Sequence, residues 1–414
     1  MKALGYARSR SESRTIADVA RAGGLDLEHV VLDRGRLQDL APAALATLEY
    51  LLHIARDRTL LVSDDAVIGD ETFRDWLAAA RRGPASGHWQ QRWEDARAAW
   101  SRSSRWEQLD FPRVLSVCVW ERQCFARCRF CPQVQHPGRL QNRTMDFGLF
   151  RHIIDQVPSD RRVDIRIGVD GESLSFPDLH RYVGYARQRL PRAFIEYATN
   201  GILLDGKRSR AVIESGLDHL MVSLNCPDRE TYRWFTGPDA YQRVIRNLRQ
   251  FQALKQQMGA PRPRLSAKIM TLQRWENQID DALAGLAEIV DQALPSHVHY
   301  YDHGELENVA DFQKPPSPLV PSCTYLSYIL SVMPDGSCDV CCASNFFKSP
   351  HPDLGNLNTA TISQVWNGAV YRQLRRTNAR GKPVVDACRR CNVDLTEFVV
   401  DLQTKARQWA YLQD

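Results

Sequence analysis

Residues 124–131 have the sequence CFARCRFC, in which Cys124, Cys128 and Cys131 follow the spacing C-x3-C-x2-C. A loop with this spacing places three thiolates around one face of an iron–sulfur cube and leaves the fourth iron without a protein ligand. Such an open iron is a place where a substrate or cofactor binds. The alternative is a zinc site that a histidine such as His136 completes. On spacing alone, the stretch predicts a metal site of one of these two kinds.

The 414-residue chain contains eleven cysteines, an odd number that cannot all pair. Its N-terminal residues lack an apolar stretch of signal-peptide length, and no run of about 18 apolar residues occurs anywhere. We therefore expect a soluble cytoplasmic protein that does not associate with membranes and whose thiols stay reduced. In such a protein, grouped cysteines indicate metal ligands or catalytic groups rather than disulfides.

The middle of the chain alternates between strand and helix patterns. Helices are expected at 147–157, 179–190, 207–215, 241–258 and 276–294. Six strands are expected at 114–120, 163–169, 194–198, 219–224, 265–270 and 297–301. This order predicts right-handed βαβ units in an α/β fold, built as an open sheet or a partial barrel. In either architecture the site lies at the carboxyl ends of the strands.

Composition shifts divide the chain into four parts. Short strands expected at 3–7, 29–32 and 59–62 indicate a small α/β domain over 1–85. A stretch rich in Trp and Arg follows and is interpreted as a linker over 86–110. The strand and helix alternation occupies 111–305. A Pro-rich segment near its end marks the boundary to a cysteine-rich C-terminal domain over 306–414.

The order of motifs on these strands resembles the radical S-adenosylmethionine (SAM) superfamily. The cysteine loop follows the first strand and has the aromatic Phe130 before its last cysteine. The sequence GVDGES at 168–173 follows the second strand and resembles the family's glycine-glycine-glutamate-proline motif. Thr199-Asn200-Gly201 and Ser223-Leu224-Asn225 end the next two strands. The resemblance covers about 114–301 and implies a partial (β/α)6 TIM-like barrel.

The resemblance also implies roles for individual residues. Cys124, Cys128 and Cys131 would hold the SAM-cleaving [4Fe–4S] cluster, whose open iron binds the methionyl group of SAM. Glu172 would accept hydrogen bonds from the SAM amine, and Phe130 would lie against the adenine. Four polar residues would approach the ribose and methionine portions: Thr199, Asn200, Ser223 and Asn225. The sequence departs from the family at Asp170 and at the missing proline after Glu172.

A second group of cysteines lies in the C-terminal domain. Cys323 and Cys341 follow the spacing C-x12-G-x4-C, and Cys388 and Cys391 form a later C-x2-C pair. Four such thiolates fit either a tetrahedral zinc or a fully ligated [4Fe–4S] cluster. Two further cysteines flank Cys341 and are alternative ligands: Cys338 and Cys342.

The context of these cysteines resembles the auxiliary-cluster region of radical SAM proteins, called the SPASM or twitch domain. The turn at 333–336, the sequence Gly355-Asn356-Leu357 and the closing CRRC carry this resemblance. Because Cys391 is the last cysteine of the chain, the region resembles the shortened form. That form implies one auxiliary [4Fe–4S] cluster, held by Cys323, Cys341, Cys388 and Cys391.

The resemblance implies that SAM is cleaved to a 5′-deoxyadenosyl radical that removes a hydrogen atom from substrate. We expect oxidation of a small polar metabolite such as a sugar, aminocyclitol or nucleoside, with the auxiliary cluster taking the electron. The alternative is a maturase that crosslinks or epimerises a ribosomal peptide. Oxidation of an alcohol requires a base, and the candidates near the end of the sixth expected strand are Tyr300, Asp302 and His303. A flavodoxin- or ferredoxin-type protein would donate the first electron.

The first residues of the chain resemble the catalytic domain of serine recombinases. Tyr6 and Arg8 match that family, but Arg10 occupies the place of the nucleophilic serine. An active recombinase is therefore not expected. The net charge of +5 is small, and Arg and Lys alternate with Asp and Glu along the chain. We therefore do not expect nucleic acid as a partner.

Overall fold

The computed structural model describes residues 2–7, 26–31, 58–61, 111–112, 114–135, 138, 140–159, 163–296, 326, 329–341 and 352–379. The first three ranges are the strands β1 (Lys2–Ala7), β2 (Asp26–Val31) and β3 (Arg58–Leu61). They form a parallel sheet in the order β2-β1-β3. Each overlaps a strand predicted from the sequence.

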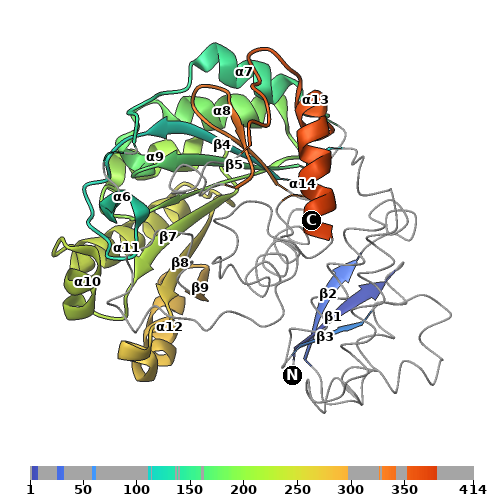
Figure 1. The fold of residues 1–414 in the computed structure, drawn as a ribbon. Coiled ribbons are helices and arrows are strands. Elements are labelled where there is room, and N and C mark those ends of the chain that lie inside the picture. The colour runs from blue at the N-terminus through green and yellow to red at the C-terminus, as the bar shows by residue number, and fades with distance from the viewer. Residues whose placement is uncertain are drawn as a thin grey trace, which may run out of the picture.

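A second sheet of eight strands contains the middle of the chain (Figure 1). Its order is β11-β10-β4-β5-β6-β7-β8-β9, and all neighbouring strands from β10 to β9 are parallel. The strands that follow one another along the chain are β4 (Val114–Glu121), β5 (Asp164–Asp170), β6 (Phe194–Thr199), β7 (His219–Asn225), β8 (Arg264–Met270) and β9 (Gln292–Ser296). This arrangement confirms the predicted α/β fold with a partial barrel.

Helices connect the strands and lie along the outer side of the curved sheet (Figure 1). They are α7 (Phe147–Asp155), α8 (Leu179–Arg189), α9 (Gly206–Glu214), α11 (Tyr241–Gln257) and α12 (Ile279–Ala287). Each buries one apolar stripe; in α7 this stripe is Phe150, Ile153 and Ile154. Among the helices in the described ranges, none is both long and apolar enough to cross a membrane.

The end of the helix predicted at 276–294 differs from the structure, and the sixth strand found precedes the segment where it was expected. The strand was expected at 297–301, which lies outside the described residues, and the predicted helix at 276–294 overlaps the strand that is found. The helix ends at Ala287, and β9 pairs with β8 from Gln292 onward. Pro295 makes this segment look unlike a strand, but β9 is the last strand in the order of the sheet. Proline is tolerated there because an edge strand leaves one row of N–H groups unpaired.

The described part of the C-terminal region joins the same sheet. Strand β10 (Ile329–Val332) pairs in parallel with β4, and β11 (Cys338–Asp339) pairs with β10 in the antiparallel direction. Between them, the Gly336 N–H donates to the Met333 carbonyl at 2.9 Å, which confirms the predicted turn. Two helices follow, α13 (Ile362–Trp366) and α14 (Ala369–Ala379).

Candidate functional site

The predicted cluster loop begins directly after β4 and continues into the short helix α6 (Pro132–Gln135). The Cys131 N–H donates to the Cys128 carbonyl at 2.9 Å, so these two cysteines flank one turn. Burial and the neighbouring Cys131 and Cys124 thiols raise the pKa of Cys128. The three predicted cysteines therefore lie on one short loop, close enough for their thiols to influence one another electrostatically. Within the described residues, no three His, Cys, Asp or Glu side chains are placed to bind a single metal ion, and His136 lies outside those residues.

Glu172 lies two residues after the end of β5, and its side chain is only 2% exposed. It accepts hydrogen bonds from the Leu174 N–H at 3.0 Å, from the Asn200 N–H at 2.7 Å and from the Thr199 hydroxyl. All three donors are neutral, and in the described ranges Glu172 has no cationic partner. Burial raises the pKa of Glu172, and the three hydrogen bonds oppose that shift.

The backbone before Glu172 is held close to the cluster loop. Gly171 has φ +151°, and a Cβ at this position would lie 2.5 Å from the carbonyl oxygen of Arg122. The Arg122 N–H in turn donates to the Asp170 carbonyl at 2.8 Å. Only glycine fits this approach. The loop whose sequence departs from the family is thus fixed against the loop that carries the cysteines.

Thr199 and Asn200 lie at the end of β6 and connect Glu172 to the cysteines. The Asn200 side-chain amide lies 3.8 Å from the Cys124 sulfur and donates toward it. The Asn200 Oδ1 accepts from the Ile202 N–H at 3.0 Å, which fixes the amide orientation. The structure therefore places the predicted residues Cys124, Glu172, Thr199 and Asn200 in one connected network.

Asn225 ends β7 with φ 67°, in the left-handed region that non-glycine residues rarely adopt. Ser223 pairs with Lys268 and Asn225 with Ile269, so Leu224 is an extra residue in β7, as in a β-bulge. Asn225 is 3% exposed, and its buried Oδ1 has no hydrogen-bond partner in the described part of the chain. Ser223 is half-buried on the same strand. A buried acceptor without a donor fits a site that a ligand with N–H or O–H groups completes.

Phe130 and Gln133 complete the described part of this region. The Phe130 ring stacks on Phe235 with centroids 5.1 Å apart, so one predicted adenine contact already packs against a core ring. The buried Gln133 accepts from the Cys124 N–H at 3.2 Å. The sequence reasoning did not identify Gln133 or Gly171 as part of the site. The sequence signal that could have indicated Gln133 is its position, two residues after Cys131 at the end of the cysteine loop.

Other predicted residues lie outside the described part of the chain. These are the base candidates Tyr300, Asp302 and His303, and the auxiliary ligands Cys323, Cys388 and Cys391, together with Cys342. Two C-terminal cysteines are described. Cys338 is buried in β11, and burial raises its pKa to about 12. Cys341 follows the strand and is half-buried.

Arg375 on α14 is a buried cation in the C-terminal region, with 2% exposure. Its Nε donates to the Leu326 carbonyl at 2.9 Å, and its guanidinium lies 4.1 Å from the ring centroid of Trp366. Among the described residues, neither terminal nitrogen, Nη1 or Nη2, has a hydrogen-bond partner. Burial lowers the pKa of Arg375 to about 10.

A helix that the sequence reasoning missed lies against the cluster loop. Helix α10 (Arg229–Thr236) begins with a capping box between Asp228 and Thr231, a signal that the sequence contains. Its C-terminal carbonyls accept from the loop: Thr236 from the Arg127 N–H at 2.8 Å and Phe235 from the Arg129 N–H at 2.9 Å. The fold of the cluster loop therefore depends on α10.

Comparison with known families locates two domains in the chain. Residues 121–257 match the family described as the Radical SAM superfamily. Residues 323–392 match the SPASM family, described as an iron–sulfur cluster-binding domain. These domains imply a [4Fe–4S] cluster that binds SAM, an auxiliary iron–sulfur cluster and SAM itself as cofactors. The side chains around Glu172 and Asn225 fit such a ligand.

Similar proteins share the fold. A segment of 172 residues is 26% identical to the GTP 3′,8-cyclase of Chlorobaculum tepidum and covers 40% of this chain and 45% of that protein, less than half of its length. Streptococcus suis SuiB bound to the precursor peptide SuiA aligns with a TM-score of 0.51 and 12% identity, over 71% of this chain and 73% of SuiB. BtrN in complex with AdoMet and 2-DOIA aligns with a TM-score of 0.43 and 20% identity, over 68% of this chain and 94% of BtrN. The family matches thus place a radical SAM domain at residues 121–257 and a SPASM-type iron–sulfur domain at residues 323–392 of this chain.

Proposed function

We propose that Cys124, Cys128 and Cys131 hold the SAM-binding cluster and that Glu172 receives the amine of SAM. The observation that carries this proposal is the buried Glu172 carboxylate, whose hydrogen-bond donors among the described residues are all neutral. A buried carboxylate without a cation is costly. The ammonium group of SAM would supply the missing charge. Because Asn200 contacts both Glu172 and Cys124, the carboxylate lies beside the cysteines that would present the open iron.

Asn225 supports the same placement. Its unpaired Oδ1 would accept from a hydroxyl or amine of SAM, and Ser223 would approach the same molecule from the same strand. We assign Thr199 the task of fixing the Glu172 carboxylate, since its hydroxyl donates directly to it. Phe130 would contact the adenine with the ring face that is turned away from Phe235. These residues would orient SAM before any chemistry begins.

We further propose that the enzyme oxidises a small polar metabolite. When bound, SAM and its cluster would supply a 5′-deoxyadenosyl radical that removes a hydrogen atom. The auxiliary cluster would supply a one-electron acceptor. The auxiliary ligands would be Cys323, Cys341, Cys388 and Cys391. Cys338 packs in the core, which supports Cys341 rather than Cys338 as the ligand.

The protein must also remove a proton from the oxidised carbon's hydroxyl group. We propose that Tyr300, Asp302 or His303 is this base. Strand β9 ends at Ser296, and the carboxyl ends of the parallel strands meet at one edge of the sheet. Connectivity therefore supports a base at that edge, since Tyr300 follows β9 by four residues. The proposed domains end at residues 85, 110 and 305.

Anaerobic reconstitution tests the cluster assignment. We expect about eight irons per chain, and about four in the Cys124→Ser variant. With dithionite and SAM, the wild-type protein should release 5′-deoxyadenosine and Cys124→Ser should not. Cys226, which is buried in the core, offers the control Cys226→Ala, which should keep both iron and release. Intact release in Cys124→Ser would refute the assignment.

The substrate class is tested with labelled compounds. Candidate sugars, aminocyclitols and nucleosides deuterated at carbinol carbons should transfer deuterium into 5′-deoxyadenosine. The oxidised product should form in equal amount. Transfer from a deuterated precursor peptide encoded near the gene, with none from any small molecule, would replace the metabolite oxidase with a peptide maturase.

A further inference from the structure

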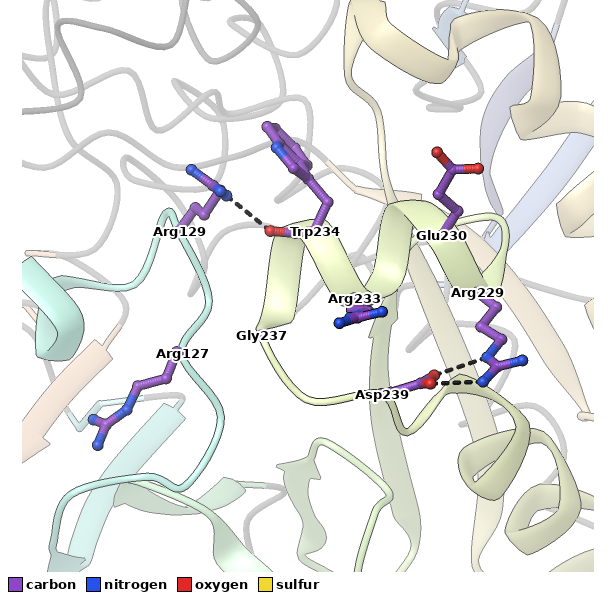
Figure 2. A pocket seen from close by; sticks show the side chains of 8 residues that line it. All are labelled: Arg127, Arg129, Arg229, Glu230, Arg233, Trp234, Gly237 and Asp239. Carbon is purple, nitrogen blue, oxygen red and sulfur yellow. Dashed lines mark hydrogen bonds and ion pairs between the residues drawn. The ribbon is translucent and has the colours of Figure 1, made fainter.

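A hollow of about 870 Å³ lies between the predicted cluster loop and helix α10 (Figure 2). Its lining includes two arginines of the loop, Arg127 and Arg129, and two arginines of the helix, Arg229 and Arg233. The carboxylates in the lining are Glu230 and Asp239. Four guanidinium groups against two carboxylates leave an excess of two positive charges. The segments that supply them are about 100 residues apart in sequence, so the charge cluster exists only in the folded protein.

The charges of the hollow are not equally available. Asp239 pairs with Arg229 through two contacts of 2.9 and 2.6 Å, which neutralises that arginine. Arg129 donates to the Trp234 carbonyl at 2.8 Å and lies 4.7 Å from the centroid of its ring. In the described ranges, the side chains of Arg127 and Arg233 make no hydrogen bond or ion pair, and both are exposed. Arg233 lies close enough to Asp239 to help lower the pKa of that carboxyl. Both guanidinium groups are nevertheless exposed and can meet carboxylates of another molecule.

The wall of the hollow is the cluster loop itself. Arg127 and Arg129 flank Cys128, and their backbone N–H groups are fixed by the carbonyls at the end of α10. On the same loop, next to Cys124, Phe125 is 42% exposed, which is unusual for a large apolar side chain in the described part of this protein. A molecule bound at Arg127 would therefore lie within one residue of a proposed cluster ligand. An exposed apolar residue within a rim of charge is typical of a protein interface.

We propose that this surface, formed by Phe125, Arg127, Arg129 and Arg233, docks an acidic electron-carrier protein of the flavodoxin or ferredoxin type. The inference rests on the proposed function, because it takes residues 124–131 as the cluster loop. In the docked complex the carrier loses one electron and the SAM-binding cluster gains it, and no bond or proton is exchanged. Carboxylates around the carrier's redox centre meet the guanidinium groups, while Phe125 makes the apolar contact. Opposite charges increase the rate of encounter and fix the orientation of the two proteins.

Direct binding tests the proposal without using catalysis. The binding of a purified bacterial flavodoxin and of an acidic two-cluster ferredoxin is measured against the reconstituted protein at low salt. Arg233→Glu should raise the Kd of the carrier by roughly 5- to 20-fold, and Arg127→Gln should raise it less. The difference should disappear near 1 M salt, where the Debye length falls to about 3 Å. Arg192→Glu is the matched control, because Arg192 is exposed beside the amino end of β6 and the change in charge is the same.

The control should leave the Kd within about 2-fold of the wild-type value. Equal Kd values for Arg233→Glu and Arg192→Glu would overturn the proposal. So would a failure of both carriers to bind the wild-type protein, or an oligonucleotide that binds in their place with the same dependence on Arg233.

Release of 5′-deoxyadenosine separates this proposal from the proposed function. With a carrier as reductant, Arg233→Glu should release it roughly 10-fold more slowly than wild type at low salt. With dithionite, which needs no docking surface, the two proteins should be equal. A loss of both rates would place Arg233 in the fold of the cluster loop and overturn docking. Wild-type protein that binds carrier but releases nothing with dithionite would contradict the proposed function and leave the surface in place.

Discussion

Two buried carboxylates, one at the amino ends of the strands of the large sheet and one at the carboxyl ends, have opposite kinds of hydrogen-bond partner. Asp218 directly precedes β7 at the amino edge and is 5% exposed, while Glu172 follows β5 at the carboxyl edge and is 2% exposed. Asp218 accepts from two guanidinium groups, those of Arg187 and Arg262, the second at 2.8 Å. It also accepts from the Ile195 N–H at 2.8 Å. Glu172 accepts only from a hydroxyl and two backbone N–H groups.

The difference separates structure from function. A buried carboxylate with its own cations joins elements of the fold, and the cations balance the cost of its burial. A buried carboxylate without cations lowers the stability of the protein alone and becomes favourable when a cationic ligand binds. A buried carboxylate can therefore have a structural role or a ligand-binding role, and the charge of its hydrogen-bond donors indicates which.

The largest effect is expected from Asp218→Asn. The change leaves Arg187 and Arg262 without a counter-charge in a half-buried region, and we expect a loss of about 3–5 kcal/mol in the free energy of unfolding. Urea denaturation of the cofactor-free protein measures it. Asp155→Asn is the control, because the Asp155–Arg189 pair is exposed and should contribute less than about 1 kcal/mol. Equal losses in the two variants would break the comparison.

Glu172→Gln should show the opposite pattern. SAM should bind roughly 10- to 100-fold more weakly, because a charged hydrogen bond contributes about 1.5–3 kcal/mol. The unfolding free energy of the cofactor-free protein should change by less than about 1 kcal/mol, since removal of a buried charge offsets the lost acceptor. Equilibrium binding of SAM to the reconstituted protein and urea denaturation measure the two effects. Unchanged SAM affinity would remove Glu172 from the binding site.

The affinity for SAM should depend on pH through Glu172. Burial raises the pKa of Glu172, so the cofactor-free protein keeps this carboxyl protonated at a pH where an exposed glutamate is ionised. The amine of SAM pairs with the ionised form, so affinity should fall as pH falls through the raised pKa, by up to about tenfold per pH unit. For folding the sign is reversed: the carboxyl destabilises the cofactor-free fold as pH rises from the unfolded pKa to the folded one. Glu172→Gln should remove both dependences.

Two glycines with positive φ, one at each end of the strands, allow a matched comparison of substitutions. Gly171→Ala would place a Cβ 2.5 Å from the Arg122 carbonyl, and Gly216→Ala would place one 2.6 Å from the Cγ of Arg187. Each should cost about 1–3 kcal/mol of stability. Only Gly171→Ala disturbs the cluster loop, so only this variant should also incorporate less iron on reconstitution. Equal iron contents would mean that the loop tolerates the displacement.

The smallest effect is expected from Asn225→Gly. Glycine removes the left-handed strain and the unpaired Oδ1, so the cofactor-free protein should gain about 1 kcal/mol in thermal or urea denaturation. Its affinity for SAM should decrease because an acceptor is lost. A gain in stability without a loss of affinity would show that Asn225 is strained for a reason other than SAM.

Much of the fold could be predicted from hydrophobic patterns. Strands β4 to β8 lie within one residue of their expected bounds, because each is an apolar run between turn signals. The helix predicted at 276–294 was extended too far, since Pro295 hides the edge strand β9, whose pairing depends on its neighbour β8. Helix α10 was missed although its capping box at Asp228 is visible in the sequence.

The site was predictable only as a set of residue types. Spacing identified Cys124, Cys128 and Cys131, and resemblance identified Glu172, Asn200 and the other SAM contacts. Neither could show that Glu172 lacks a cation, because that depends on which side chains of distant segments meet it. The arginine surface could not be predicted from the sequence for the same reason, since Arg127 and Arg233 come together only through the contact between the cluster loop and α10.

Strand β10 has a practical consequence for dissecting the protein. Its residues Ile329–Val332 are all buried and occupy the open side of β4, the strand that leads into the cluster loop. A chain shortened at residue 305 would lose this cover and present an apolar strand edge to other molecules. Such a truncated protein should aggregate rather than behave as an isolated SAM-binding half. The two halves of the enzyme are therefore best separated by point substitutions, with the whole polypeptide kept intact.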